Sequence, residues 1–327
     1  MLPANKGDDP KTCTERRSIV IPEEMEKHLI ARNRKHFGQA KGNFPTIPPF
    51  SEHVNWAAST HEADLILEGE YENEEIQGIG KIFIEHMQRT TKLDSISGYL
   101  TENEWVGKMK VWRESTSTSP SKLHIGHHKI LIYKFDDGDK IEDNTSRWDF
   151  LRTTIEAQDH HEPPQQQPPS LEEMRIALLL AQIGLMNYAI NHGYVYKRWT
   201  SVVNMMILKE ENNTKIHQLR VIHLYKADYN LLLGVKWRQL MHHTVNNHLL
   251  HPSQYGGTPG RDSITPVLIT EMQYEITRAT RKPFVTLDFD ATSCYDRIIE
   301  SVASLAARSF GPKKSLFLVH ARHLQEA

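Results

Sequence analysis

The stretch FVTLDFDATSCYDR, residues 284–297, is the most informative segment of the sequence. It follows Arg281-Lys282-Pro283 and begins with apolar and polar residues in alternation, which is typical of a β-strand with one buried face. Successive side chains of a strand point to opposite faces, so one face carries Val285, Leu287 and Phe289 and the other carries Thr286, Asp288 and Asp290. The segment therefore predicts a short strand that ends in two carboxylates on the same side.

Two like charges side by side at the end of a strand are costly unless a cation or an arginine lies beside them. Asp288 and Asp290 are therefore candidates for a cation site, at the kind of position where sheet enzymes place their chemistry. A second interpretation needs no ligand. Asp290 and Ser293 precede a predicted helix from Cys294 to Ser309, and they would cap its first turn. The alternation by itself leaves both interpretations open.

The residues upstream predict helices and one hairpin. Ser170-Leu171-Glu172-Glu173 has the spacing of a capping box and predicts the start of a buried apolar helix that reaches about Asn191. Residues 202–208 and 219–225 are rich in β-branched and apolar residues, and the polar turn between them predicts a hairpin with a loose tip. Further helices are predicted at 237–250 and from about residue 261, on either side of a glycine-rich break. The fold class is therefore α+β.

Composition excludes several classes of protein. No segment approaches the roughly eighteen consecutive apolar residues of a membrane span, and residues 1–14 lack the apolar core of a secretory signal. Cys13 and Cys294 lie far apart, which fits a reducing compartment better than a disulfide framework. We therefore expect a protein of the nucleus or cytoplasm that is neither secreted nor embedded in a membrane.

The net charge of −2 is distributed unevenly: residues 1–169 carry −7 and residues 170–327 carry +5. A basic C-terminal half is a hint of a polyanionic partner. Ordinary variation of surface charge accounts for it equally well.

Several motifs follow one another in an order that resembles the reverse transcriptases of non-LTR (LINE-type) retrotransposons. Residues 219–224, LRVIHL, resemble the fingers motif in which arginine precedes two apolar residues, and residues 253–263, SQYGGTPGRDS, resemble its glutamine-aromatic-glycine block. Asp290, four further residues and then Tyr295-Asp296 resemble the first catalytic motif, in which a strand ends in aspartate and an aromatic-aspartate pair opens a helix. Residues 117–129 are similar to a conserved block nearer the N-terminus. The resemblance covers roughly residues 105–310.

The resemblance implies the fingers and a partial palm of a right-hand polymerase behind a helix-rich N-terminal region. Residues 1–100 would be a polar and partly disordered N-terminal region, and residues 101–157 an N-terminal extension of the polymerase. A proline- and glutamine-rich linker would follow at residues 158–169. The fingers-like region would span residues 170–282 and the partial palm residues 283–327.

The resemblance also implies a role for individual residues in RNA-templated DNA synthesis. Nucleotide addition is a phosphoryl transfer assisted by two divalent metals. Asp290 would bind Mg²⁺ or Mn²⁺ together with the Ala291 carbonyl, and Tyr295 would lie under the incoming sugar and exclude a 2′-hydroxyl. Arg220, with Lys209 beside it, would contact the deoxynucleotide triphosphate. The residues expected to contact the RNA template or DNA primer are Gln254, Gly257 and Arg261.

Two other classes of function stay open. One is a non-catalytic nucleic-acid-binding remnant of a retroelement, which would keep the basic groove without the chemistry. The other is a metal-binding module, because His124, His127 and His128 have a spacing that can hold zinc on a helix. Gly126 and the lack of a cysteine at ligand spacing argue against the zinc module.

We predict that this chain does not extend a primer. The second catalytic motif, aromatic-x-Asp-Asp, does not occur in the 31 residues that follow Asp296, so the resemblance implies a truncated palm and incomplete metal binding. The measurement is incorporation of labelled deoxynucleotide on a primed RNA template, with a complete reverse transcriptase as the positive control. Extension by this chain would contradict the prediction.

Overall fold

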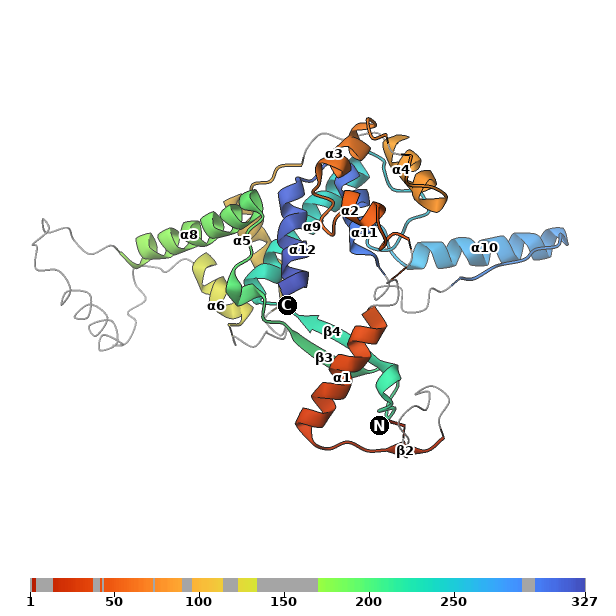
Figure 1. Cartoon of the computed structure of the whole chain (residues 1–327), viewed down its shortest axis with the longest axis horizontal. Helices are drawn as coiled ribbons and strands as arrows, with labels where there is room; N and C mark the ends of the chain where they lie inside the picture. The colour runs from red at the N-terminus through yellow and green to blue at the C-terminus, as the bar shows by residue number, and fades with distance from the viewer. Residues whose placement is uncertain are drawn as a thin grey trace, which may run out of the picture.

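The computed structural model describes residues 2–3, 14–37, 42, 44–72, 74–89, 96–113, 123–133, 170–289 and 298–326. Helices predominate, and the described residues form two small antiparallel sheets of two strands each. In Figure 1 a helical body carries three projections: one end of α8 (Leu171–His192), the helix α10 (Ile264–Thr280), and the hairpin β3–β4 (Val203–Leu208 and Leu219–Leu224) with α1 (Pro22–Phe37) lying across it. The predicted α+β class is confirmed at this level.

The larger hydrophobic core lies between helices from the middle and the end of the chain. It is formed by α5 (Glu102–Val111), α6 (Ile125–Lys129), α8, α9 (Ala227–Asn246) and α12 (Lys314–Glu326). Its largest fully buried side chains include Trp105, Trp199 and Tyr229. Trp199 belongs to the short helix η2 (Lys197–Trp199), and Leu131 and Ile132 of the short helix η1 (Ile130–Ile132) pack against the core. Aromatic side chains of this size contribute much of the free energy of such a core.

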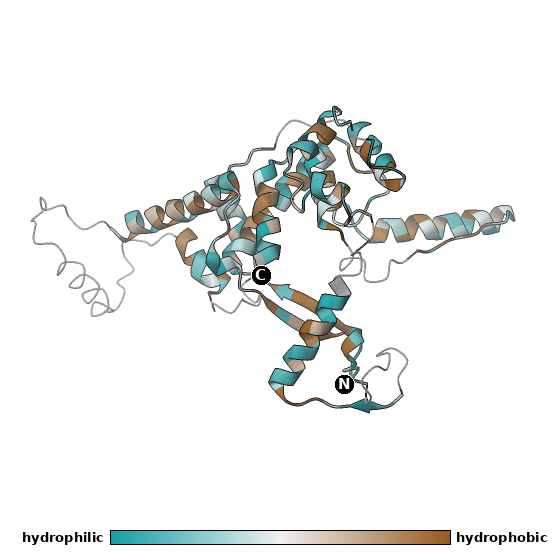
Figure 2. Cartoon of the chain, viewed as in Figure 1, coloured by the Kyte–Doolittle hydropathy of each residue, from teal (hydrophilic) through white to brown (hydrophobic). Residues whose placement is uncertain are grey.

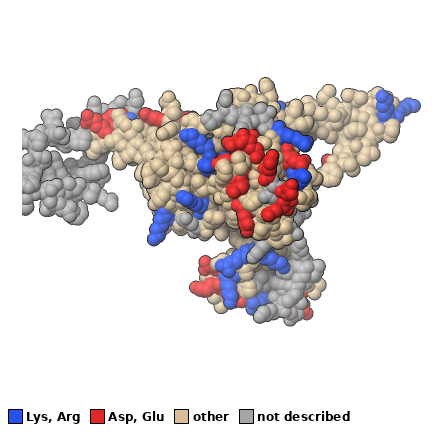
Figure 3. All heavy atoms as spheres, turned by 45° about the horizontal axis from the view of Figure 1, so that its top comes forward, with Lys and Arg blue, Asp and Glu red and all other residues tan. Residues whose placement is uncertain are grey.

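A second core joins the N-terminal helices to the C-terminal part of the chain. Here α2 (Phe50–His53), α3 (His61–Glu68) and α4 (Ile79–Arg89) pack around Phe44, Phe50 and Phe83, whose rings meet edge to face. Leu305 of α11 (Glu300–Ser309) completes this core. The predicted helix-rich N-terminal region is therefore present, and the acidic residues 68–75 lie at its surface, where Figure 3 shows the Asp and Glu side chains gathered.

The helix predicted after the proline- and glutamine-rich stretch is confirmed as α8. Ser170 Oγ accepts a hydrogen bond from the Glu173 amide at 3.2 Å, and the Glu173 carboxylate accepts one from the Ser170 amide at 2.7 Å. The expectation that this helix is buried holds for one of its faces only. One face buries Leu179, Ile183 and Met186, whereas the other leaves apolar side chains at least half exposed, including Leu178, Leu180 and Leu185.

The predicted hairpin is confirmed with a continuous register. Val203 pairs with Leu224 and Leu208 pairs with Leu219. The short helix η3 (Ile216–Gln218) leads into β4, and Arg32 of α1 donates a hydrogen bond to the Leu219 carbonyl oxygen at 3.0 Å. A further short pair, β1 (Leu2–Pro3) and β2 (Arg16–Arg17), precedes α1.

The helix predicted at 237–250 begins ten residues earlier, at Ala227, and ends at Asn246. Its first turns contain Asp228, Asn230 and Gly234, residues with a weak preference for a helix interior, which hides the helix in the sequence. The buried side chains of Leu231, Leu232 and Val235 explain the difference, because packing in the larger core compensates for weak local preference.

The strand predicted at residues 284–289 is not formed. Neither sheet of the described residues includes this segment, and Val285, Leu287 and Phe289 are 80%, 73% and 90% exposed. A strand needs a neighbour to satisfy its backbone hydrogen bonds, and the described chain provides none here. The segment follows α10, which buries none of its side chains and carries apolar residues along its whole length (Figure 2).

No helix in the described parts of the chain is both long enough and apolar enough to cross a membrane.

We predict that acid destabilises the fold through His323 of α12. This side chain is fully buried and stacks on Tyr229 with ring centroids 4.2 Å apart. Burial lowers the pKa of His323 to about 4. The unfolded chain therefore binds the proton more readily, so the stabilising contribution is complete above about pH 6.5 and is lost as the pH falls toward 4, a change on the order of 3 kcal/mol.

The measurement is the free energy of unfolding from pH 7 to pH 4 for the wild type and for His323→Phe. The variant should show a shallower acid limb, whatever its absolute stability. His242→Gln, at an exposed position of α9, is the control and should keep the wild-type slope. Identical slopes for His323→Phe and the wild type would disprove this role.

Candidate nucleic-acid interface

The hairpin presents Arg220 on an exposed face. Arg220 pairs with Ile207, and residues directly opposite one another in an antiparallel pair point to the same side of the sheet. That side also carries Met205 and Ile222. The apolar side chains on it are exposed: Met205 to 49%, Ile207 to 45% and Ile222 to 42%. We call this set, Met205, Ile207, Arg220 and Ile222, the hairpin face. It combines a guanidinium group with an accessible apolar surface.

Lys209 lies at the same end of the hairpin as Arg220. The last pair of the hairpin register joins Leu208 of β3 to Leu219 of β4. Lys209 follows Leu208 directly after β3, and Arg220 follows Leu219 within β4. Lys209 is exposed. The structure therefore brings these two predicted phosphate-binding residues together.

The segment between α9 and α10 forms a turn that brings Gln254 and Arg261 together. The Arg261 guanidinium donates hydrogen bonds to the carbonyl oxygens of Gln254, at 3.0 Å, and of Pro252, and it lies 5.4 Å from the ring centroid of Tyr255. Thr258 is buried and donates to the Gln254 carbonyl oxygen at 3.0 Å. Arg261 therefore holds the turn together, a role that the motif alone did not indicate.

Gly257 meets a backbone requirement of this turn. Its φ of +70° is in the left-handed region that residues with a Cβ adopt only at a cost, and a Cβ added there would have no neighbour within 4 Å. The space beside this glycine is open, so the backbone at Gly257 can be approached closely.

The residues predicted to do the chemistry, Asp290, Ala291 and Tyr295, lie outside the described residues. Asp288, the last carboxylate before them that is described, is exposed. Oxygen donors such as a carboxylate and a backbone carbonyl are the ligands that Mg²⁺ prefers, so the predicted donor set suits that ion.

Residues that sequence reasoning missed hold the base of the hairpin. The carboxylate of Asp228, which is 1% exposed, accepts a hydrogen bond from Trp199 Nε1 at 2.9 Å and forms an ion pair with Arg198. Arg198 and Trp199 lie in η2, just before β3, and Asp228 lies in the first turn of α9, just after β4. We call these three residues the hairpin clamp. Only the tertiary structure shows that they meet.

The histidines proposed as a zinc site have other partners. His124 Nδ1 accepts from the Gly126 amide at 3.1 Å, and His127 Nδ1 accepts from the His124 amide at 3.0 Å, so both rings cap the start of α6. His128 Nδ1 lies 2.6 Å from Gln182 Nε2. Within the described ranges there is no group of three or more histidine, cysteine, aspartate or glutamate side chains placed to hold a metal ion.

Comparison of the chain with protein-family models, with curated proteins and with solved structures gave no match.

We predict that removing the clamp carboxylate destabilises the fold and loosens the hairpin. Asp228→Ala leaves the buried Trp199 indole N–H without its acceptor, at a cost of about 1–3 kcal/mol. The Arg198 guanidinium also loses its partner, but its side chain is 45% exposed, so water can solvate the charge. Asp228→Asn keeps an oxygen that can accept from Trp199 and should lose less.

The measurements are the free energy of unfolding and amide hydrogen exchange of β3 and β4. The control is Glu70→Ala, which removes a carboxylate from an exposed position. Asp228→Ala should speed exchange in both strands more than Glu70→Ala does. Equal exchange in the two variants would show that the clamp does not hold the hairpin.

Proposed function

We propose that this chain is the fingers region and the first part of the palm of an RNA-directed DNA polymerase of the non-LTR retrotransposon type. The partners would be an RNA template, a DNA primer and deoxynucleotide triphosphates, with Mg²⁺ or Mn²⁺ as cofactor. The observation that carries the proposal is the hairpin β3–β4, because it occurs at the residues of the fingers motif and presents Arg220 and Lys209 at one end of an exposed face.

The chemistry of the hairpin face supports a nucleotide ligand. A guanidinium group offers a planar fork of N–H donors that matches phosphate oxygens, and Lys209 adds a second positive charge beside it. The exposed side chains of Met205, Ile207 and Ile222 offer an apolar surface to a sugar or base. Arg220 would bind and orient the triphosphate, and the clamp would keep the hairpin in position while it does so.

The turn at residues 252–263 supports contact with a nucleic-acid strand. Gly257 leaves its backbone accessible, and Arg261 orders the turn around it through the Pro252 and Gln254 carbonyls. Gln254 and Arg261 would lie against the template or primer backbone. Such contacts to phosphate and sugar set the position of a strand without reading its sequence.

Within the proposed function, Asp290 and the Ala291 carbonyl would hold the divalent ion, which neutralises charge on the triphosphate. Tyr295 would stack under the sugar and reject ribose by contact with its 2′-hydroxyl. Both roles rest on the match between residues 290–296 and the first catalytic motif.

The second candidate function is a non-catalytic nucleic-acid binder derived from such a polymerase. The basic balance of residues 170–327 favours it as much as it favours the enzyme. The two differ in one property: the polymerase fragment binds a triphosphate at Arg220, whereas the remnant needs only the polynucleotide.

We predict that Arg220→Ala weakens binding of deoxynucleotide triphosphate, in the presence of a primed RNA template and Mg²⁺, by about tenfold or more. That is the effect of losing a charge-assisted contact of about 1.5–3 kcal/mol. Arg220→Lys should lose part of the affinity because an ammonium group cannot form the bidentate contact. The measurement is photocrosslinking or equilibrium binding of a labelled deoxynucleotide triphosphate.

The control for this experiment is Arg89→Ala, which removes an arginine with an 81% exposed side chain from α4, outside the hairpin. Its affinity for the triphosphate should equal that of the wild type. Binding of the primed template without any triphosphate binding would favour the non-catalytic remnant. Failure to bind either ligand would exclude both candidates.

A further inference from the structure

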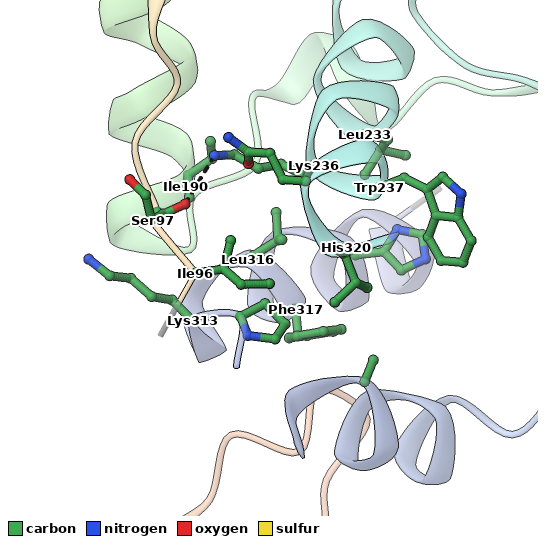
Figure 4. A pocket seen from close by; sticks show the side chains of 15 residues that line it. Ile96, Ser97, Ile190, Leu233, Lys236, Trp237, Lys313, Leu316, Phe317 and His320 are labelled. Carbon is green, nitrogen blue, oxygen red and sulfur yellow. Dashed lines mark hydrogen bonds between the residues drawn. The ribbon is translucent and has the colours of Figure 1, made fainter. Parts of the chain in front are cut away.

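A cavity of about 310 Å³ lies inside the helical body, away from the hairpin face. It is partly open to solvent and is lined by residues of α9, α11, α12, the segment 96–98 and the last turns of α8 (Figure 4). Its wall is mainly apolar and includes Ile96, Ile190, Leu233, Leu240, Leu316 and Phe317. Volumes of this order are at the small end of the range for small-molecule sites, which are typically apolar with a few polar groups that fix orientation.

Lys236 of α9 supplies the buried charge at this cavity. It is 6% exposed, and its Nζ donates to the Tyr99 carbonyl oxygen at 3.0 Å and lies 3.5 Å from the Ser97 carbonyl oxygen, as the dashed contact in Figure 4 shows for Ser97. An ammonium group has three N–H donors, and two carbonyl oxygens engage two of them. One donor remains for a ligand.

The other charged or titratable groups around Lys236 do not neutralise it directly. Glu104 of α5 attracts it, but its carboxylate accepts hydrogen bonds from Thr101 and from the Gln239 amide. Lys313 repels it and points away from the cavity, with its Nζ 5.6 Å from the ring centroid of Tyr99 (Figure 4). His320 of α12 faces the cavity too, and its Nδ1 lies 3.1 Å from the Tyr229 hydroxyl.

Burial lowers the pKa of Lys236 to about 8, although Glu104 partly opposes the shift. Below that pH the side chain is an ammonium ion set into an apolar wall. A buried charge of this kind is costly unless a counter-ion lies against it.

We propose that this cavity binds an apolar monocarboxylate about the size of a medium-chain fatty acid, with its carboxylate on Lys236 Nζ and its tail among Leu233, Leu316 and Phe317. One buried ammonium ion balances one negative charge. A phosphate would bring more charge and would need more donors than the single lysine offers. The site is separate from the hairpin face, so the proposal is independent of the polymerase function.

The first experiment compares decanoate with decan-1-ol by isothermal titration calorimetry on the full chain, below the concentrations at which either self-associates. The wild type should bind decanoate more tightly than the alcohol, and Lys236→Met should weaken decanoate binding at least tenfold while leaving the alcohol unchanged. Lys110→Met, at an exposed position of α5, is the control and should behave as the wild type. Equal affinity of Lys236→Met and the wild type for decanoate would overturn the assignment of the carboxylate to Lys236.

The second experiment keeps the proposal testable if Lys236→Met fails to fold. Ala307 of α11 lines the cavity, so Ala307→Phe should fill it and abolish binding of both decanoate and decan-1-ol. The affinity of the wild type for decanoate should also fall about tenfold per pH unit above pH 8, as Lys236 loses its proton. Undiminished binding by a folded Ala307→Phe, or no binding of decanoate by the wild type, would refute the site.

Discussion

One buried carboxylate connects the parts of this structure. Asp228 accepts from Trp199 before the hairpin and pairs with Arg198, and it does so from the first turn of α9 after the hairpin. Because the residues just before β3 bind a carboxylate just after β4, the base of the hairpin is held in place against the helical body. Because a two-stranded ribbon is marginal by itself, its stability depends on this anchorage and on α1, which donates to the Leu219 carbonyl oxygen. The neighbouring Tyr229 then stacks on His323, which carries the constraint from α9 to α12.

A second carboxylate joins the N-terminal helices to the C-terminal ones. Asp64 of α3 binds Arg308 of α11 at 2.6 Å and Lys314 of α12 at 2.9 Å. Burial by itself would raise the pKa of Asp64, but the hydrogen bonds from Lys314 and Arg308 outweigh it, and the pKa is lowered. The ionised carboxylate is therefore stabilised across a sequence separation of about 250 residues, where Leu305 enters the N-terminal core.

These anchors separate two surfaces that differ in chemistry. The hairpin face is exposed and carries Arg220, and Lys209 follows β3 at the same end of the hairpin. Together they suit a phosphate-bearing ligand at the molecular surface. The cavity at Lys236 is partly open and mainly apolar, with a buried ammonium ion in its wall. The first is positioned by the clamp and the second by the packing of α9 against α12.

Local patterns were enough to predict the capping box at Ser170 and the hairpin at residues 203–224, because both depend on neighbours a few residues apart. Composition and residue pattern also predicted the α+β class and the glycine-rich break between two helices, but not the contact between Arg261 and Gln254 across that break. Three features became visible only in the folded chain: α9 begins at Ala227, residues 284–289 form no strand, and Asp228 accepts a hydrogen bond from Trp199. All three depend on residues distant in sequence. The start of α9 and the contact of Asp228 are stabilised by burial against such residues, which outweighs local preference. Residues 284–289 form no strand because the described residues offer no neighbouring strand to pair with.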